Sequence, residues 1–272
     1  MPKVLVFDSG LGGLTVLREI AKARPDTELS LVADDAAFPY GRLSDQALVE
    51  RVVAVLDRYL ALLDPSLVVI ACNTASTLAL PVLRARFSLP FVGTVPAIKP
   101  ACAQSKTKRV SVLATPATVR RDYTQELVHE FAHDCRVTLV GAEMLASFAE
   151  AALRGGPVDD REIRGEIAPC FVDDGARTDT VVLACTHYPL ILDRLENLAP
   201  WPVAWLDPAP AIARRVSQLL GPERAAKAGL ARAYFTSGTT GSGTLSSSLH
   251  SFGVELARGE TLPPPTGHPG LT

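Results

Sequence analysis

Long apolar runs are absent from this sequence. No stretch reaches the roughly 18 apolar residues of a membrane-spanning helix, and the opening MPKVLVFDSG has the pattern of a β-strand rather than of a signal peptide. An excess of charge of one sign is absent as well. The formal net charge is −2, which gives no reason to expect nucleic acid or an anionic membrane as a partner. We therefore expect a cytoplasmic protein that binds neither.

Paired cysteines are also absent. The five cysteines are odd in number and include no C-x-x-C pair, so a disulfide framework and a cysteine-type zinc site are both disfavoured. The segment HEFAH (129–133) matches the H-E-x-x-H zinc signature. However, His129 and His133 fall on the helix face opposite the apolar stripe that contains Leu127 and Phe131. A catalytic zinc needs both histidines turned inward, so no metal is expected.

Complete phosphate-binding motifs are missing too. The sequence G-x-G-x-x-T over residues 10–15 follows the first predicted strand, and Asp34 lies about 20 residues further on, but the third glycine of the dinucleotide fingerprint is absent. SGTTGSGT (237–244) has threonine where a phosphate loop needs lysine. A tight turn and a flexible loop are the simpler interpretations, and no cofactor is expected. The functional alternative for the first motif is that Asp8 and Ser9 face a cleft.

What the sequence does have is a regular alternation of short aliphatic runs with helical periodicity over most of its 272 residues. Such runs, rich in Val, Ile and Leu, are typical of parallel strands that are covered on both faces. Ser44 can cap a helix over 44–63, and a second helix is predicted over 118–133. This rhythm predicts a doubly wound α/β fold. The predicted strands are residues 3–8, 29–33, 67–71, 90–93, 109–114, 136–141, 180–184 and 203–206.

One strand pattern occurs twice. VVIACNTAS (68–76) and VVLACTHYP (181–189) each contain an aliphatic run that ends on a cysteine, Cys72 or Cys185, and continues into polar residues that can cap a helix. The repeat predicts two pseudo-symmetric doubly wound α/β domains with the active site in the cleft between them. We place the first domain at 1–94 and 208–261, the second at 95–207, and a disordered tail at 262–272, which is rich in Pro and Gly.

Both cysteines lie where a sheet of this kind binds ligands. In open α/β sheets that place is beyond the carboxyl ends of the strands, and a helix N-terminus there lowers the pKa of a thiol. One such cysteine is more often a small buried residue that closes a strand, but two in matching positions favour a site with one thiol on each side. Inverting a stereocentre by proton transfer needs a base on one face of the carbon and an acid on the other, and a thiol can take either role.

Taken together, these residues resemble the cofactor-independent glutamate racemases of the aspartate/glutamate racemase group. The resemblance implies the two-domain fold, interconversion of L- and D-glutamate for peptidoglycan synthesis, no cofactor, and a homodimer. It extends over roughly residues 3–215 and is carried by five motifs in the same order, FDSGLGGLTVL (7–17), PYG (39–41), ACNTAS (71–76), LATPATV (113–119) and LACTHYPL (183–190).

The resemblance also implies roles for individual residues. Cys72 and Cys185 exchange the acid and base roles, with Asp8 beside Cys72 and His187 beside Cys185. Glu150, in SFAEAAL, matches a glutamate that supports the cysteine of the first domain. The residues expected to hold the substrate are Asp8, Ser9, Pro39, Tyr40, Gly41, Asn73, Thr74, Thr118, Thr186 and His187.

Some positions depart from the family pattern, and other functions stay open. Pro116 and Ala117 stand where a glycine often precedes the threonine, and Arg120 and Arg121 stand where a small polar residue is common. The alternatives are racemisation of aspartate or a related acid, binding of an acidic ligand without catalysis, and nicotinamide-dependent oxidation or reduction. The threonine and histidine after Cys185 favour glutamate, and the intact cysteine pair weighs against pure binding.

Overall fold

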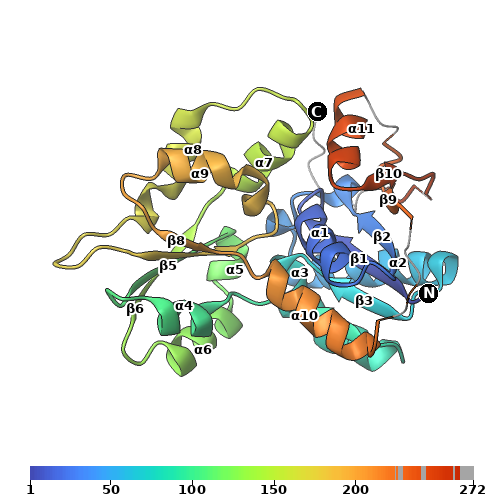
Figure 1. The fold of residues 1–272 in the computed structure, drawn as a ribbon, viewed down its shortest axis with the longest axis horizontal. Helices are drawn as coiled ribbons and strands as arrows, with labels where there is room; N and C mark the ends of the chain where they lie inside the picture. The colour runs from blue at the N-terminus through green and yellow to red at the C-terminus, as the bar shows by residue number, and fades with distance from the viewer. Residues whose placement is uncertain (224, 226–228, 240–242, 260, 264–272) are drawn as a thin grey trace.

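Two lobes, each built around a parallel sheet, make up the molecule (Figure 1). The computed structural model describes residues 1–223, 225, 229–239, 243–259 and 261–263. The first sheet contains β1 (Lys3–Asp8), β2 (Glu28–Ala33), β3 (Leu67–Ile70), β4 (Phe91–Gly93), β9 (Ala231–Phe235) and β10 (Val254–Leu256). The second contains β5 (Arg109–Ala114), β6 (Arg136–Gly141), β7 (Thr180–Ala184) and β8 (Ala204–Leu206).

The two sheets share one strand order. The first runs β10-β9-β2-β1-β3-β4 and the second runs β6-β5-β7-β8, so β2-β1-β3-β4 corresponds to β6-β5-β7-β8. All pairings are parallel. The strands that lead to the two cysteines, β3 and β7, therefore hold equivalent places. This confirms the predicted pair of pseudo-symmetric α/β units.

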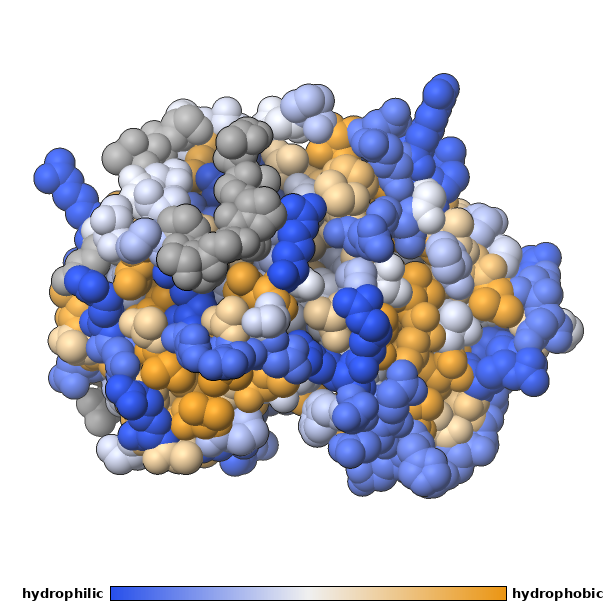
Figure 2. Space-filling model, turned by 180° about the vertical axis from the view of Figure 1, so that it is seen from behind, coloured by the Kyte–Doolittle hydropathy of each residue, from blue (hydrophilic) through white to orange (hydrophobic). Residues whose placement is uncertain are grey.

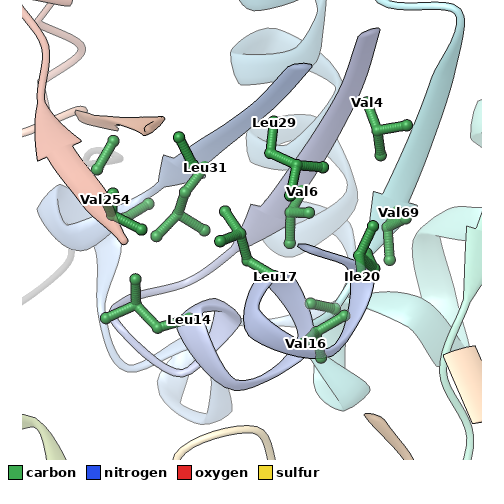
Figure 3. Packing of buried hydrophobic residues seen from close by; sticks show 14 of the residues in the cluster. Val4, Val6, Leu14, Val16, Leu17, Ile20, Leu29, Leu31, Val69 and Val254 are labelled. Atoms are coloured by element: carbon green, nitrogen blue, oxygen red, sulfur yellow. The ribbon is translucent and has the colours of Figure 1, made fainter. Parts of the chain in front are cut away.

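Helices cover both faces of the first sheet, as a doubly wound fold requires. Alternate residues of β1 point to opposite faces: Val4 and Val6 pack with α1 (Gly13–Ala23), α10 (Ala209–Leu220) and α11 (Gly243–Ser251). Leu5 and Phe7 instead pack with α2 (Asp45–Leu63) and α3 (Asn73–Arg86). Figure 3 shows the α1 side, where leucines and valines of helix and strands meet. Each such fully buried side chain contributes on the order of 1.5–3 kcal/mol.

The second sheet is enclosed in the same way. On one face lie α7 (Leu145–Leu153), α8 (Asp160–Ile167) and α9 (Leu192–Leu198), which pack with Leu113 and Leu183. On the other lie α4 (Ile98–Gln104) and α6 (Asp122–Phe131), which pack with Val112 and Val182. Short helical turns lie at the connections: η1 (Asp35–Ala37), η2 (Tyr40–Arg42), α5 (Pro116–Val119), η3 (Ala168–Cys170) and η4 (Tyr188–Ile191).

The eight predicted strands all form, within one residue at either end. The helix predicted over 44–63 forms as α2, and the Ser44 hydroxyl accepts from the Ala47 amide at 3.3 Å. The helix predicted over 118–133 is wrong in one respect. It is broken into α5 and α6, because Arg121 is extended (φ −69°, ψ 134°).

The carboxyl-terminal part of the chain departs further from expectation. β9 and β10 extend the first sheet beyond β2 and were not among the predicted strands. The tail predicted to be disordered from Leu262 begins later, because Leu262 is buried and its amide donates to Thr236 O at 2.8 Å. Residues 264–272 of that tail, and 240–242 of the glycine-rich loop, lie outside the described residues.

The chain passes between the lobes twice. It leaves the first lobe after β4 and returns between β8 and α10, since α10 packs against α1. The predicted boundaries near 94–95 and 207–208 lie in these connections and stay predictions of the sequence. A notch between the lobes is visible at the lower edge of Figure 2. Among the described residues, no helix is both long and apolar enough to cross a membrane.

Candidate active site

A small cavity lies where the carboxyl ends of the two sheets face each other. In each sheet the strand order changes direction between equivalent strands, β1 and β3 or β5 and β7, and ligands of such folds bind at this point. The cavity measures about 20 Å³, room for about one water. Its lining comes from both lobes: Ser9, Phe38, Pro39, Tyr40, Gly41, Cys72, Asn73, Thr74, Thr115, Ala146, Ala184, Cys185, Thr186 and His187.

Cys72 is the N-cap residue of α3 and is buried. Burial raises the pKa of its thiol to about 12, and the nearby Asp8 carboxylate acts in the same direction. Hydrogen bonds from the Ala75 amide and from Ser9, whose Oγ lies 3.6 Å from the sulfur, oppose the rise. In this environment Cys72 carries its proton at neutral pH.

Asp8 ends β1 and is fully buried, yet its carboxylate has two donors. The Gly10 amide donates to Oδ1 at 3.1 Å, and the Thr186 hydroxyl of the second lobe donates to Oδ2 at 2.9 Å. Burial raises the pKa of Asp8 to about 6, although the charge of His187 and both hydrogen bonds lower it. Asp8 is therefore ionised at neutral pH and close to its titration range.

His187 lies beside Cys185 and links it to Glu150. Its Nδ1 lies 4.0 Å from Cys185 Sγ, and its Nε2 lies 2.9 Å from Glu150 Oε2. Burial lowers the pKa of His187, but hydrogen bonds with Cys185 and Glu150 outweigh this and hold it well above its ordinary value. Burial likewise raises the pKa of Glu150, and the contact with His187 reverses the direction. The result is a buried imidazolium–carboxylate pair beside one thiol.

The incomplete glycine motif has a structural explanation in the close approach of the lobes. A Cβ atom on Gly12 would lie 2.3 Å from Thr186 Oγ1 and 2.6 Å from His187 Nδ1, and one on Gly10 would lie 2.9 Å from Glu150 Oε2. The Leu11 amide between them donates to Glu150 Oε2 at 2.9 Å. These glycines let the first-lobe backbone reach the side chains of the second lobe. Of the two residues expected to face a cleft, Ser9 lines the cavity and Asp8 lies behind it.

Polar groups that can bind a ligand lie at the cavity and at the contact between the lobes. Asn73 lines the cavity, is buried, and among the described residues has no hydrogen-bond partner for either side-chain polar atom. The hydroxyls of Thr74, Thr115 and Thr118 lie 3.0–3.2 Å from one another and join the two lobes. An unpaired buried amide is costly, and a ligand that bonds to it removes the cost.

Most of the predicted site residues line the cavity, and three lie behind it. Asp8 contacts Thr186, Thr118 contacts Thr74, and Glu150 contacts His187. The role that the resemblance gave Glu150, support of the first cysteine, disagrees with these contacts, because its carboxylate is paired with the histidine beside Cys185.

Tyr40 lines the cavity, and its hydroxyl is held by a side chain of its own lobe. Its hydroxyl donates to Asp34 Oδ2 at 2.5 Å, and Arg51 donates to both oxygens of the same carboxylate. Asp34, the acidic residue that follows the incomplete dinucleotide fingerprint, is therefore occupied by side chains of its own lobe. This arrangement fixes the adjoining Pro39 and Gly41 at the cavity wall.

Four lining residues were missed by the reasoning from sequence: Phe38, Thr115, Ala146 and Ala184. Thr115 follows β5 as Ser9 follows the end of β1, so the rule on strand ends could have found it. Phe38 packs its ring against His187, with centroids 5.2 Å apart; a single aromatic in a loop gives no such signal. The structure also corrects the second cysteine motif, since Cys185 precedes the short turn η4 rather than a long helix.

The zinc signature lies away from this site. His129 and His133 are exposed on and just after α6, as expected. No group of three or more His, Cys, Asp or Glu side chains placed to hold a metal occurs within the described part of the chain. Of the two arginines that depart from the family pattern, Arg121 pairs with Asp45 of the first lobe and Arg120 is exposed.

Comparison with known proteins agrees with this geometry. The family model described as Asp/Glu/Hydantoin racemase matches residues 9–216. The chain belongs to this racemase family. The glutamate racemase of Brucella anthropi is 58% identical over 224 residues, covering 82% of this chain and 81% of the relative. That of Brucella canis is 56% identical over 219 residues, covering 80% of this chain and 79% of the relative.

A solved structure of the same racemase family covers almost the whole chain. Escherichia coli glutamate racemase, in complex with L-glutamate and the activator UDP-MurNAc-ala, superimposes with a TM-score of 0.87 at 40% identity. The match covers 96% of this chain and 98% of that one. The similarity therefore extends over both lobes and over their relative arrangement.

Proposed function

We propose that this racemase interconverts L-glutamate and D-glutamate by proton transfer at Cα between Cys72 and Cys185. The observation that carries the proposal is the placement of two buried thiols on opposite lobes at one cavity, each at the end of an equivalent strand. A carbon held between them has a proton acceptor on one face and a donor on the other, which is the requirement for inversion.

The surroundings of the two thiols support a starting state. Burial and the nearby Asp8 carboxylate raise the pKa of Cys72 to about 12, so we assign Cys72 the acid role, and we assign the base role to Cys185, which lies beside the imidazolium of His187. Cys185 then removes the Cα proton, and Cys72 donates its proton to the opposite face. The bond from Cα to hydrogen breaks on one side as another forms on the other, so no proton is gained or lost overall. The reverse reaction starts with the two roles exchanged.

The difficult step is the removal of a weakly acidic Cα proton. Preorganised donors in a water-poor site stabilise the developing negative charge. Asn73, Thr74 and Thr186 offer amide and hydroxyl groups at the cavity, and the backbone at Tyr40 and Gly41 opens η2 there. We assign these groups, with Ser9, to the ammonium and carboxylates of the substrate.

Glutamate is far larger than one water, so the lobes must separate for the substrate to enter. Separation breaks the contacts of Thr186 with Asp8 and of Glu150 with the Leu11 amide. The shape of the cleft in the closed state then excludes bulk water during proton transfer.

We further propose a cytoplasmic homodimer that supplies D-glutamate for peptidoglycan. The supporting observation is the likeness to the Brucella and Escherichia coli enzymes that carry the glutamate racemase name. Sedimentation of the purified protein tests the dimer.

Circular dichroism of L-glutamate, incubated with the purified protein and no added cofactor, tests the reaction. The signal is expected to decay to zero as the racemate forms. L-Aspartate, treated identically, is expected to keep its signal. Decay of the aspartate signal alone would assign the protein to aspartate, and constant signals with both acids would reject the proposal.

A further inference from the structure

Arg154, directly after α7, is a cation that neither the mechanism nor the sequence motifs use. Its Nε and Nη2 donate to Glu150 Oε1 at 3.1 and 2.9 Å, and the guanidinium lies over the ring of Phe235. Glu150 belongs to the second lobe and Phe235 to the end of β9 in the first. Arg154 therefore sits on the boundary between the lobes.

Across that boundary Arg154 meets a second carboxylate. Nη2 lies 3.7 Å from Oδ2 of Asp35, in η1 of the first lobe. Asp35 is itself held by the carboxyl end of β9: the Ser237 amide donates to Oδ1 at 2.9 Å, and the Ser237 hydroxyl donates to Oδ2 at 2.6 Å. The side chains of Asp35 and Glu150 are only 8% and 10% exposed.

The two oxygens of Glu150 have different partners. Oε1 accepts from Arg154, whereas Oε2 accepts from the Leu11 amide and lies 2.9 Å from Nε2 of His187. Arg154 thus holds one oxygen of the Glu150 carboxylate, while the other oxygen contacts the histidine. An exposed ion pair usually contributes little to stability, but here one guanidinium joins two mostly buried carboxylates. The network of contacts continues through Glu150 to His187, which contacts Cys185.

We propose that Arg154 is a positioning residue that bridges Asp35 of the first lobe and Glu150 of the second, and so fixes Glu150 against His187 when the lobes are together. The proposal rests on the function proposed above for the same site. It assigns two effects to one side chain: Arg154 favours the closed arrangement of the lobes, and it orients the His187 ring beside Cys185.

Arg154→Gln separates positioning from folding. We expect kcat/KM for L-glutamate to fall about tenfold, the loss of one charge-assisted hydrogen-bonded contact, while the circular dichroism spectrum of the variant shows a native fold. Arg154→Lys keeps the charge without the planar fork and is expected to restore part of the activity. Arg194→Gln, which removes an exposed pair with Asp160, is the matched control and should keep native activity. Native kcat/KM in Arg154→Gln, or no rescue by lysine, contradicts the proposal.

Asp35→Asn tests the bridge itself. If both residues act through one contact, Asp35→Asn lowers kcat/KM several-fold in the native background and has no further effect in Arg154→Gln, because the two changes are then non-additive. Effects that multiply in the double variant overturn the bridge.

Alkylation of the two buried active-site thiols gives a readout that needs no substrate. Iodoacetamide reaches Cys72 and Cys185 only when the lobes separate, so peptide mass spectrometry of both sites is expected to show several-fold faster modification in Arg154→Gln and Asp35→Asn. Equal rates in native protein and variants reject the bridge. If native protein leaves glutamate unchanged, the proposed function fails, while the alkylation rates still decide whether Arg154 holds the lobes together.

Discussion

Cys72 and Cys185 follow strands that hold the same place in their sheets, but their neighbours differ. A carboxylate, Asp8, lies near the first thiol, and an imidazolium paired with Glu150 lies beside the second. The equivalent strands bring the two sulfurs to one cavity from opposite lobes. Burial and Asp8 raise the pKa of Cys72, whereas Cys185 lies beside a histidine that is paired with a carboxylate. The symmetry of the fold accounts for the equivalent positions of the two thiols, and the different side chains around them account for their different electrostatic surroundings.

The largest loss of activity is expected when either thiol is removed. Cys72→Ser and Cys185→Ser are each expected to lower kcat for racemisation at least about 10³-fold, because a hydroxyl is too weak an acid to exchange these roles near neutral pH. Melting temperatures should stay close to native. Cys135→Ser, at a cysteine that does not line the cavity, is the control. Near-native turnover in either active-site variant rejects the two-cysteine assignment.

The Cys185 side is tested by Glu150→Gln. An amide cannot hold His187 in its protonated form, so kcat/KM is expected to fall about 10²-fold, on the scale seen when the partner of a reacting residue is lost. Since the enantiomers have equal free energy, the fall must be the same from L- and from D-glutamate. Glu162→Gln, at an exposed position of α8, should leave the rate unchanged. A mild effect of Glu150→Gln would mean that His187 acts without its carboxylate.

The contact between the two lobes is tested at Gly12. Its φ of −56° suits any residue, so Gly12→Ala acts through the clash with Thr186 and His187 and not through backbone strain. We expect kcat/KM to fall roughly 30-fold, because small displacements of reacting groups are costly. Gly165→Ala is the control, since a Cβ there meets nothing within 4 Å. Native kinetics in Gly12→Ala would show that the lobes need not meet as closely during turnover.

The Cys72 side is tested by pH. Burial raises the pKa of Asp8 to about 6, so the folded protein binds this proton at pH values where a free aspartate is ionised. If the ionised form is required, kcat/KM falls as pH decreases through 6, about tenfold at pH 5. Asp8→Asn should be slow and should lack this limb of the profile. A limb that persists in Asp8→Asn belongs to another group.

Much of this arrangement was predictable because the sheet signals are local. The aliphatic runs before Cys72 and Cys185 give the strands, and parallel strands bring their carboxyl ends to one edge of a sheet, so the position of each cysteine at the ligand-binding edge of its own sheet followed from the sequence. The repeated motif also predicted equivalent places in two units. These inferences need only the residues within each segment.

What could not be predicted depends on contacts between distant segments. The partner of Glu150 is a histidine 37 residues later, and the use of Gly12 becomes visible only when Thr186 is placed against it. β9 contains an exposed arginine, Arg232, within ARAYF, and β10 spans only Val254–Leu256. Neither gave a strand signal, because the pairing of β9 with β2 and of β10 with β9 supplies most of the order.

Deuterium incorporation during racemisation in D₂O tests the central claim most directly. L-Glutamate is incubated with the protein in D₂O. During the first few per cent of conversion the two enantiomers are separated, and the deuterium content of each is measured by mass spectrometry. Two thiols on opposite faces predict that the D-glutamate formed carries deuterium at Cα from the first turnovers, while unreacted L-glutamate keeps its proton. Deuterium entering the recovered L-glutamate as fast as the product would mean that a single group serves both faces, and would contradict the two-cysteine mechanism.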